Sequence, residues 1–233
     1  MGLLETESWT ADALTLIDSS TKLLPEIPAY MFIRHSHRNT PADFYKIRDE
    51  PLTEIGKSAA YEFGSRLNPL RHYHLLHSPI LRCKTTAQQI LLGLESQHIK
   101  ASFDGVFPIL LNVAGIHREQ LTLQIRDKKN YVPNWIGGFY NPVVLEPALH
   151  YSQRAATHFL PLHRCAQPND CFIFVGHDDM TMVLRNGWLG IPPDDKWMDF
   201  LGGFLMQIES QHFRAFHRGV QSHIPFPYWW NRL

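Results

Sequence analysis

The sequence predicts an α/β protein, a three-layer α/β/α sandwich built on a mostly parallel central sheet. Short apolar runs typical of buried strands alternate along the chain with longer segments whose apolar residues recur every three to four positions. Strands and helices that alternate in this way form a parallel sheet with helices on both faces. With 233 residues and 44% hydrophobic content, the chain can bury one sizeable core. We therefore expect a single domain over residues 1–233, with an irregular insert at residues 104–147 that shapes the substrate site.

The first half of the chain contains two strand–helix units behind a polar lead-in at residues 1–25, which holds one amphipathic helix. The first strand is expected at residues 29–33. The helix after it starts near Thr53, a favourable N-cap residue. Its buried stripe recurs every four residues and consists of Ile55, Ala59, Phe63 and Leu67. A second strand at residues 74–77 leads to Ser78-Pro79, an N-cap followed by proline, which predicts the start of the second helix.

The second half begins with a stretch, residues 101–147, in which glycine, proline and aromatic residues are scattered and regular alternation is lost. We interpret most of this stretch as the insert. A helix at residues 148–163 restores the pattern. The run Cys171–Val175 is the clearest buried strand of the chain, and a further helix follows it. Residues 204–208 and 213–216 are expected to form a closing hairpin.

The bulk composition argues against two classes of partner. A formal net charge of zero is unlike a nucleic-acid-binding protein that works through overall attraction, so any anion must be attracted locally. The N-terminus lacks the basic start and apolar core of a signal peptide, and the most apolar later stretch, residues 106–116, is too short to cross a bilayer. Three cysteines without framework spacing fit a reduced compartment, with a Cys165–Cys171 bridge left open. We expect a cytoplasmic protein with no nucleic-acid or membrane partner.

The most informative stretch is Arg34-His35-Ser36-His37-Arg38, which directly follows the first predicted strand. Open α/β sheets bind ligands at the carboxyl ends of their strands. Two guanidinium groups at such a place repel a metal cation and bind a phosphate group bidentately. A neutral imidazole between them can attack phosphorus and carry the phosphoryl group covalently. The stretch predicts a phosphohydrolase, provided that other segments supply more phosphate ligands and a proton donor.

Two other segments share this layout of an apolar strand, a polar cluster and a helix. One runs from Leu76 to Arg82, and the other is Val175-Gly176-His177-Asp178. If the strands are parallel neighbours, all three clusters meet at one edge of the sheet. Arg82 would then lie in the first turn of its helix, where the partial positive charge of the helix also favours anions.

These motifs resemble those of the histidine phosphatase superfamily, which contains the phosphoglycerate mutases and the histidine acid phosphatases. The superfamily signature Arg-His-Gly-x-Arg corresponds to Arg34–Arg38, its Ser-x-x-x-Arg element to Ser78–Arg82, and its late histidine to His177. Its Leu-Thr-x-x-Gly helix start is similar to Leu52–Gly56. The resemblance implies a phosphoglycerate mutase-like fold. It covers residues 29–95 and 148–190 but not the insert.

The resemblance also implies roles for individual residues. His35 would be the nucleophile that becomes phosphohistidine, and Asp178 would protonate the leaving oxygen and then activate water. The phosphate group would be bound by Arg34, Arg38, Arg82 and His177. A His-Asp pair at this place resembles the acid phosphatase branch rather than the mutase branch. No metal and no cofactor are implied; the partners would be a phosphorylated small-molecule substrate and inorganic phosphate as product.

Several alternatives remain open at this point. Ser36 stands where the superfamily has glycine, so its Cβ could crowd the phosphate or its hydroxyl could add a donor, and a protein that binds phosphate without turnover is one alternative. Asp178 could instead cap the next helix, which would leave Asp179, or Glu119 in the insert, as the acid. His37 is a rival nucleophile. A metal-dependent hydrolase would use the His-x-His spacing and the late pair, that is His35, His37, His177 and Asp178.

Overall fold

The computed structural model describes residues 2–40, 50–111, 120–121 and 128–232, and seven strands within them form one sheet in the order β3-β2-β4-β1-β5-β6-β7. Four neighbouring strands run parallel: β3 (Ala101–Val106), β2 (His72–His77), β4 (Asp170–Gly176) and β1 (Ala29–Arg34). Three more continue the sheet from β1 through antiparallel pairs: β5 (Gly203–Ile208), β6 (His212–His217) and β7 (Val220–Pro225). Because β1 and β4 lie at the centre, the segments that follow them meet at one edge of the sheet.

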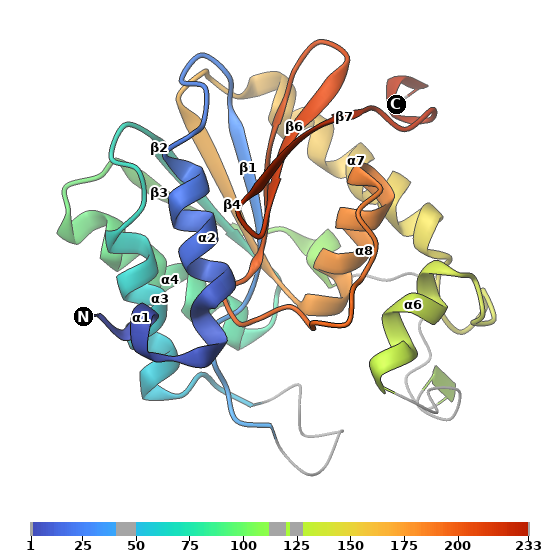
Figure 1. Ribbon diagram of the computed structural model, residues 1–233, viewed down its shortest axis with the longest axis horizontal. Coiled ribbons are helices and arrows are strands. Elements are labelled where there is room, and N and C mark those ends of the chain that lie inside the picture. Colours follow the sequence, from blue (N-terminus) through green and yellow to red (C-terminus); the bar gives the residue numbers. More distant parts are fainter. Residues whose placement is uncertain (1, 41–49, 112–119, 122–127, 233) are drawn as a thin grey trace.

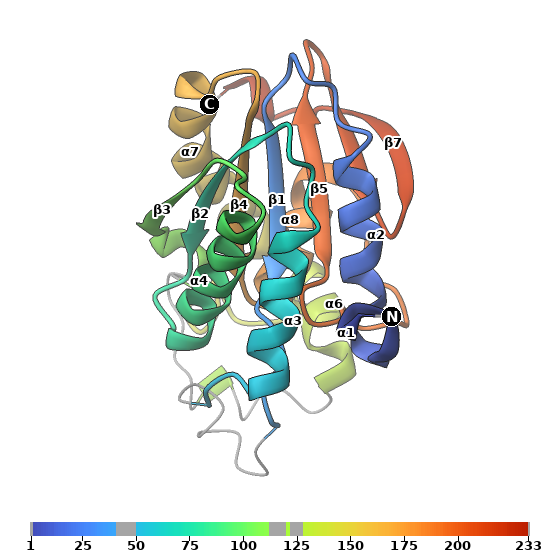
Figure 2. The same cartoon turned by 90° about the vertical axis from the view of Figure 1, so that its left-hand side faces the viewer.

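Helices cover both faces of this sheet, which confirms the three-layer α/β/α sandwich (Figure 1 and Figure 2). One face carries α2 (Ala11–Ser20), α3 (Glu54–Ser65) and α4 (Leu81–Ser96), with the short α1 (Leu3–Thr6) beside α2 and α3. The other face carries α6 (Tyr131–Ile136), α7 (Ala148–Cys165) and α8 (Asp178–Leu189). In the ranges that the structure describes, none of the helices is long and apolar enough to span a bilayer.

Strand β1 separates the two hydrophobic cores. Ala29, Met31 and Ile33 face the core under α2, α3 and α4, whereas Tyr30 and Phe32 face the core under α7 and α8. Phe32 stacks between Phe174 of β4 and Phe204 of β5, at ring-centroid distances of 4.4 and 5.1 Å. A strand buried on both faces explains why this segment is a continuous apolar run rather than an alternating one.

The two helices that follow β1 and β2 start differently from each other. Thr53 caps α3 as predicted, because its hydroxyl accepts a hydrogen bond of 3.1 Å from the backbone N–H of Gly56. The prediction that Ser78-Pro79 opens the second helix is wrong: α4 begins at Leu81, with Ile80 as its N-cap. The Ser78 hydroxyl lies instead 3.0 Å from a ring nitrogen of His177 and forms a hydrogen bond with it. Arg82 still lies in the first turn of α4.

The region taken as irregular contains one strand that the sequence analysis did not predict. Residues 101–106 form the edge strand β3, so the first three residues of the stretch 104–147 belong to the sheet. This strand is half-exposed and irregular at Gly105, which removes the alternation that would have identified it. The closing hairpin is confirmed as β5 and β6, and the exposed edge strand β7 extends it. All three cysteines are free, so Cys165 and Cys171 form no bridge.

Candidate active site

The loop that follows β1 is tied to the strands on both sides of it. The backbone N–H of Arg34 donates to the carbonyl of Gly202, just before β5, over 2.8 Å. The N–H of His35 donates to the carbonyl of Gly176, at the end of β4, over 3.0 Å. These two hydrogen bonds place His35 at the carboxyl edge of the parallel strands, beside the segment that begins α8.

His35 is held as a neutral imidazole. Its ring is buried, and its Nδ1 lies 2.8 Å from the carbonyl oxygen of Ser36. A carbonyl oxygen only accepts hydrogen bonds, so Nδ1 carries the proton and Nε2 keeps its lone pair. Burial first, and then the charge of Arg82, hold the pKa of His35 well below its ordinary value. An imidazole in this state keeps the lone pair of Nε2 available at neutral pH.

The charges of Arg82 and Arg34 act on this imidazole, and the guanidinium of Arg38 interacts with both of them. Arg38 and Arg82 are buried, and burial together with repulsion from neighbouring guanidinium groups lowers the pKa of each. The Nε atoms of Arg34 and Arg38 are buried and have no hydrogen-bond partner among the described residues. Like charges held together without enough acceptors favour a bound anion, and guanidinium groups are well suited to phosphate oxygens.

His177 is the N-cap residue of α8 and contacts the same cluster. Its Nε2 lies 3.0 Å from the Ser78 hydroxyl and its Nδ1 lies 3.3 Å from a guanidinium nitrogen of Arg82. Since a guanidinium only donates, Nδ1 accepts and Nε2 carries the proton. Burial and the charge of Arg82 lower the pKa of His177, so this ring is neutral too. In this arrangement His177 orients Arg82.

Asp178 is ion-paired in the structure. Its Oδ2 lies 3.1 Å from a guanidinium nitrogen of Arg34 and accepts a 2.7 Å hydrogen bond from the indole N–H of Trp197. Burial raises the pKa of Asp178, but the charge of Arg34 and the Trp197 hydrogen bond outweigh this effect and lower it. Asp178 is the first residue of α8, with His177 as the N-cap, and its Oδ1 accepts from the N–H of Asp179. Asp178 is therefore not the cap residue of α8, and its carboxylate contacts Arg34 and Trp197 instead.

Asp179 behaves in the opposite way. Burial, followed by repulsion from the ionised Asp178, raises the pKa of Asp179 to about 6. Two adjacent carboxyl groups therefore hold different charges at slightly acidic pH, one ionised and one protonated. The sequence alone did not distinguish their protonation states, because both residues follow the same strand.

The segment between α8 and β5 supplies residues that the sequence analysis missed. Besides the Trp197 indole, the Met198 carbonyl accepts a 2.6 Å hydrogen bond from Arg34, and the Phe200 ring lies 4.0 Å from the Arg34 guanidinium carbon. No motif or periodicity marks this coil. Its only signal is indirect: a strand that pairs antiparallel with β1 must begin where β1 ends, and the coil directly precedes that strand.

Ser36 and His37 have contacts within the protein fold. The Ser36 hydroxyl donates to the carbonyl of Gly56 over 2.6 Å, and its backbone is not in the left-handed region that would favour glycine. The His37 ring stacks on Trp9, and its Nδ1 lies 2.8 Å from the Thr53 hydroxyl. Ser36 and His37 thus link the loop to α3 and the N-terminal segment.

The two remaining alternatives from the sequence have different outcomes. The metal-ligand set is not assembled, since no three of its ligand atoms lie within 4.8 Å of one another; all four residues, His35, His37, His177 and Asp178, are described. Glu119, the alternative acid in the insert, lies outside the described residues.

A comparison with protein families identifies the chain. The sequence profile of the histidine phosphatase superfamily (branch 1) matches residues 30–202, most of the sheet and the whole cluster described above. The chain belongs to the histidine phosphatase superfamily. Membership of this superfamily supports phosphoryl transfer through a phosphohistidine. The finer expectation, the acid phosphatase branch, is not confirmed by this match. The comparison with curated proteins gives no match.

Several solved structures resemble this chain in fold at low sequence identity. YhfR from Bacillus stearothermophilus is 17% identical, with a TM-score of 0.57 over 84% of this chain and 98% of that one. A phosphoglycerate mutase from Bacillus anthracis is 14% identical, with a TM-score of 0.53 over 86% and 94%. A mycobacterial glucosyl-3-phosphoglycerate phosphatase in complex with VO3 is 16% identical, with a TM-score of 0.52 over 85% and 99%. At such identities the likeness establishes the phosphoglycerate mutase-like fold.

Proposed function

We propose that the protein hydrolyses phosphate monoesters through a covalent phosphohistidine on His35. The observation that carries this proposal is the buried, neutral imidazole of His35. Its Nδ1–H donates to a carbonyl oxygen, and the charges of Arg34 and Arg82 lower its pKa. In the first step, Nε2 of His35 forms a bond to phosphorus as the bond from phosphorus to the leaving oxygen breaks. The guanidinium groups stabilise the negative charge of the equatorial oxygens in the transition state.

We assign the phosphate ligands as the sequence predicted, with one refinement for His177. Arg34, Arg38 and Arg82 bind the phosphate directly. His177 contacts Arg82 and Ser78 in the absence of ligand, so it positions the Arg82 guanidinium and can also turn its ring toward a bound oxygen. This assignment matches the charge of the site, in which three cations face one ionised carboxylate and can accept a dianion.

Asp178 is our choice for the proton donor, acting together with Asp179. Without ligand, Arg34 keeps Asp178 ionised. A bound phosphate dianion competes for Arg34 and places negative charge close to Asp178, and both effects raise the pKa of this carboxyl. Asp179, which holds a proton up to about pH 6, is the adjacent source. The protonated acid then donates to the leaving oxygen, and as a carboxylate it takes a proton from the water that attacks the phosphohistidine.

The test of the nucleophile is hydrolysis of a generic aryl phosphate by the wild type and by His35→Ala. We expect the variant to lose activity by at least about 10³-fold, because no covalent intermediate can form. Rapid acid-free denaturation of the wild type during turnover should yield an acid-labile phosphoenzyme that His35→Ala lacks. His37→Ala is the matched control and should keep the phosphoenzyme. Unchanged turnover in His35→Ala, or labelling of His37 instead, would refute the assignment.

The test of the acid uses leaving groups of different basicity with Asp178→Asn. General acid catalysis contributes about 10²–10⁴-fold, and a poor leaving group needs it most. We therefore expect a loss of this size on alkyl phosphates and a much smaller loss on an aryl phosphate with an acidic phenol. For Glu119→Gln, measured in parallel, we expect the activity relative to the wild type to be the same for every leaving group. If Glu119→Gln shows the dependence and Asp178→Asn does not, the proton comes from the insert.

Interconversion of phosphoglycerate isomers by the wild type would favour a mutase over a hydrolase.

A further inference from the structure

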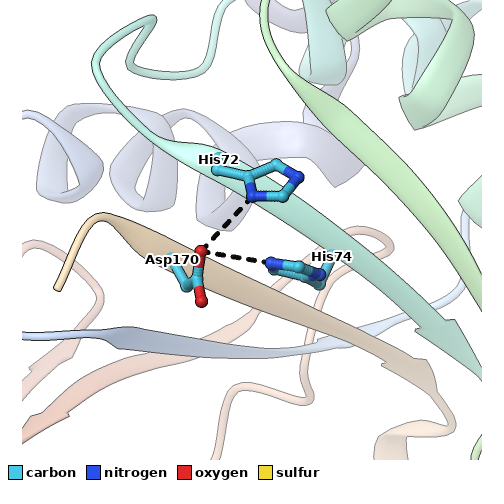
Figure 3. A group of neighbouring side chains, drawn as sticks. All are labelled: His72, His74 and Asp170. Atoms are coloured by element: carbon cyan, nitrogen blue, oxygen red, sulfur yellow. Dashed lines mark ion pairs between the residues drawn. The ribbon is translucent and has the colours of Figure 1, made fainter. Parts of the chain in front are cut away.

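A second cluster of titratable side chains lies at the opposite edge of the sheet from the candidate active site. His72 and His74 come from the first half of β2, and Asp170 is the first residue of β4, paired in register with His72 (Figure 3). The site residues Ser78 and His177 follow the other ends of the same two strands. No step of the proposed reaction uses the cluster.

We propose that His72, His74 and Asp170 form a binding site for a borderline divalent cation such as Zn²⁺. Figure 3 shows both imidazoles directed at one carboxylate oxygen: Oδ1 of Asp170 lies 3.3 Å from Nδ1 of His72 and 3.2 Å from Nε2 of His74. Tetrahedral zinc has bonds of about 2.0–2.1 Å to nitrogen and oxygen, which puts neighbouring ligand atoms about 3.3–3.4 Å apart. The two distances to Oδ1 already match this geometry, and all three ligand atoms lie within 4.8 Å of one another, which leaves a fourth position for water.

The hydrogen-bonding state of His74 supports a cation at this place. Its Nδ1 lies 2.9 Å from a carboxylate oxygen of Asp104, which can only accept, so in the neutral ring Nδ1 carries the proton and Nε2 keeps a lone pair. This Nε2 is buried without a hydrogen-bond partner among the described residues. It nevertheless lies against the Asp170 oxygen. Two acceptor atoms in contact repel each other, and a bound cation replaces that repulsion with two coordinate bonds.

The surroundings of the cluster resemble the support that metal sites have. Asp104 is the extra residue of a β-bulge in β3, opposite the step from Leu75 to Leu76, and it holds the outer nitrogen of His74. Carboxylates in this position fix the tautomer of a metal-binding histidine.

The Asp170 carboxylate is fixed by the backbone. Its Oδ2 accepts a 2.8 Å hydrogen bond from the N–H of Gln167, whereas its Oδ1 faces the two imidazoles. A carboxylate held in this way can offer Oδ1 to a cation.

A second group of metal-ligating residues, Glu209, His212 and His223, provides a natural control. There the Nε2 of His212 is already paired with Glu209 over 2.6 Å, and His223 is exposed, so no buried lone pair faces the group. We expect this group to bind Zn²⁺ weakly. It shares residue types with the proposed site but not the supporting carboxylate.

The experiment is titration of the metal-free full chain with Zn²⁺ by calorimetry, together with Co²⁺ absorption as a probe of tetrahedral geometry. We expect one tight site in the wild type with a tetrahedral Co²⁺ spectrum, and its loss in His72→Gln and in Asp170→Asn. Asp104→Asn should bind about 10- to 100-fold more weakly, because only the outer support is removed. His212→Gln should leave the tight site unchanged. Saturating Zn²⁺ should raise the Tm of the wild type but not that of His72→Gln.

Several outcomes would overturn the proposal. Equal Zn²⁺ affinity in the wild type and in folded His72→Gln would do so, as would loss of the tight site in His212→Gln alone. Absence of any tight binding by the wild type would also do so. Because the site lies at the far edge of the sheet, EDTA should lower the Tm of zinc-loaded protein without lowering turnover at moderate temperature. Loss of turnover with EDTA that persists in His72→Gln would point to a metal elsewhere.

Discussion

The reactivity of His35 depends on its immediate contacts and on its burial. A single hydrogen bond to the Ser36 carbonyl selects the tautomer, and burial beside Arg82 keeps the ring neutral. Asp178 and Asp179 show the same sensitivity with opposite results. Arg34 and Trp197 stabilise the charge of Asp178, whereas burial and the charge of Asp178 outweigh the hydrogen bond that Asp179 accepts from the Met180 N–H. Residue type alone therefore does not determine which group carries a proton.

The raised pKa of Asp179 predicts a pH-dependent cost in stability. The ordinary pKa of this carboxyl is 3.8 and its pKa in the folded protein is about 6, so folding takes up a proton between these values. The free energy of unfolding of the wild type should then fall as pH rises through this window and stay lower above it. Asp179→Asn has no such group. We expect urea unfolding to show the variant gaining stability relative to the wild type between pH 4 and pH 7, with the gain complete above about pH 6.

Asp178→Asn is a suitable control for this measurement. The pKa of Asp178 is lowered on folding, so its contribution is fully present above the ordinary value and is lost as pH falls. A stability difference between wild type and Asp179→Asn that does not change with pH would contradict the raised pKa.

At the scale of elements, helix α3 holds the loop that carries His35, the proposed nucleophile. The Gly56 carbonyl accepts from the Ser36 hydroxyl, and the Thr53 N–H donates to the His37 carbonyl over 3.1 Å. A Cβ on Gly56 would lie 2.2 Å from the carbonyl oxygen of His37, a contact that real structures do not show. The start of α3 is therefore in direct backbone contact with the loop after β1.

This contact predicts the effect of Gly56→Ala. The new methyl group must displace the loop backbone, and overpacking of this kind costs about 1–3 kcal/mol of stability. We expect a lower Tm together with a loss of kcat on an aryl phosphate, because His35 shifts with the loop. Ser58→Ala, on the exposed side of the same helix, is the matched control and should affect neither. A folded Gly56→Ala protein with wild-type kcat would show that the loop does not depend on this contact.

At the scale of the whole molecule, one sheet carries two sites at opposite edges. The segments after β1, β2 and β4 meet at the carboxyl edge, where ligands bind in open α/β sheets. The cluster of His72, His74 and Asp170 lies at the beginning of β2 and β4. A cation there would join the two strands that carry Ser78 and His177 at their other ends, and so would stabilise the sheet without taking part in phosphoryl transfer.

The sequence by itself determined the sheet-and-helix plan and most of the candidate site. Apolar runs and helical periodicity are local signals, and strand ends in a parallel sheet converge, so three separate polar clusters could be placed together before the structure was known. The edge strands β3 and β7 were missed because exposed strands lack a continuous apolar run. The start of α4 was misplaced because the Ser78 hydroxyl contacts His177, distant in the sequence, instead of capping a helix.

Only the tertiary structure decided the charges and the supporting contacts. Whether a carboxyl is ionised depends on burial and on neighbours such as Arg34 and Trp197, which are far from Asp178 in the sequence. The cluster of His72, His74 and Asp170 was invisible for the same reason, since β2 and β4 are neighbours only after the chain has crossed the sheet. The sequence shows which ionisable and metal-ligating residue types are present. Their protonation and their partners depend on distances that arise only when the chain folds.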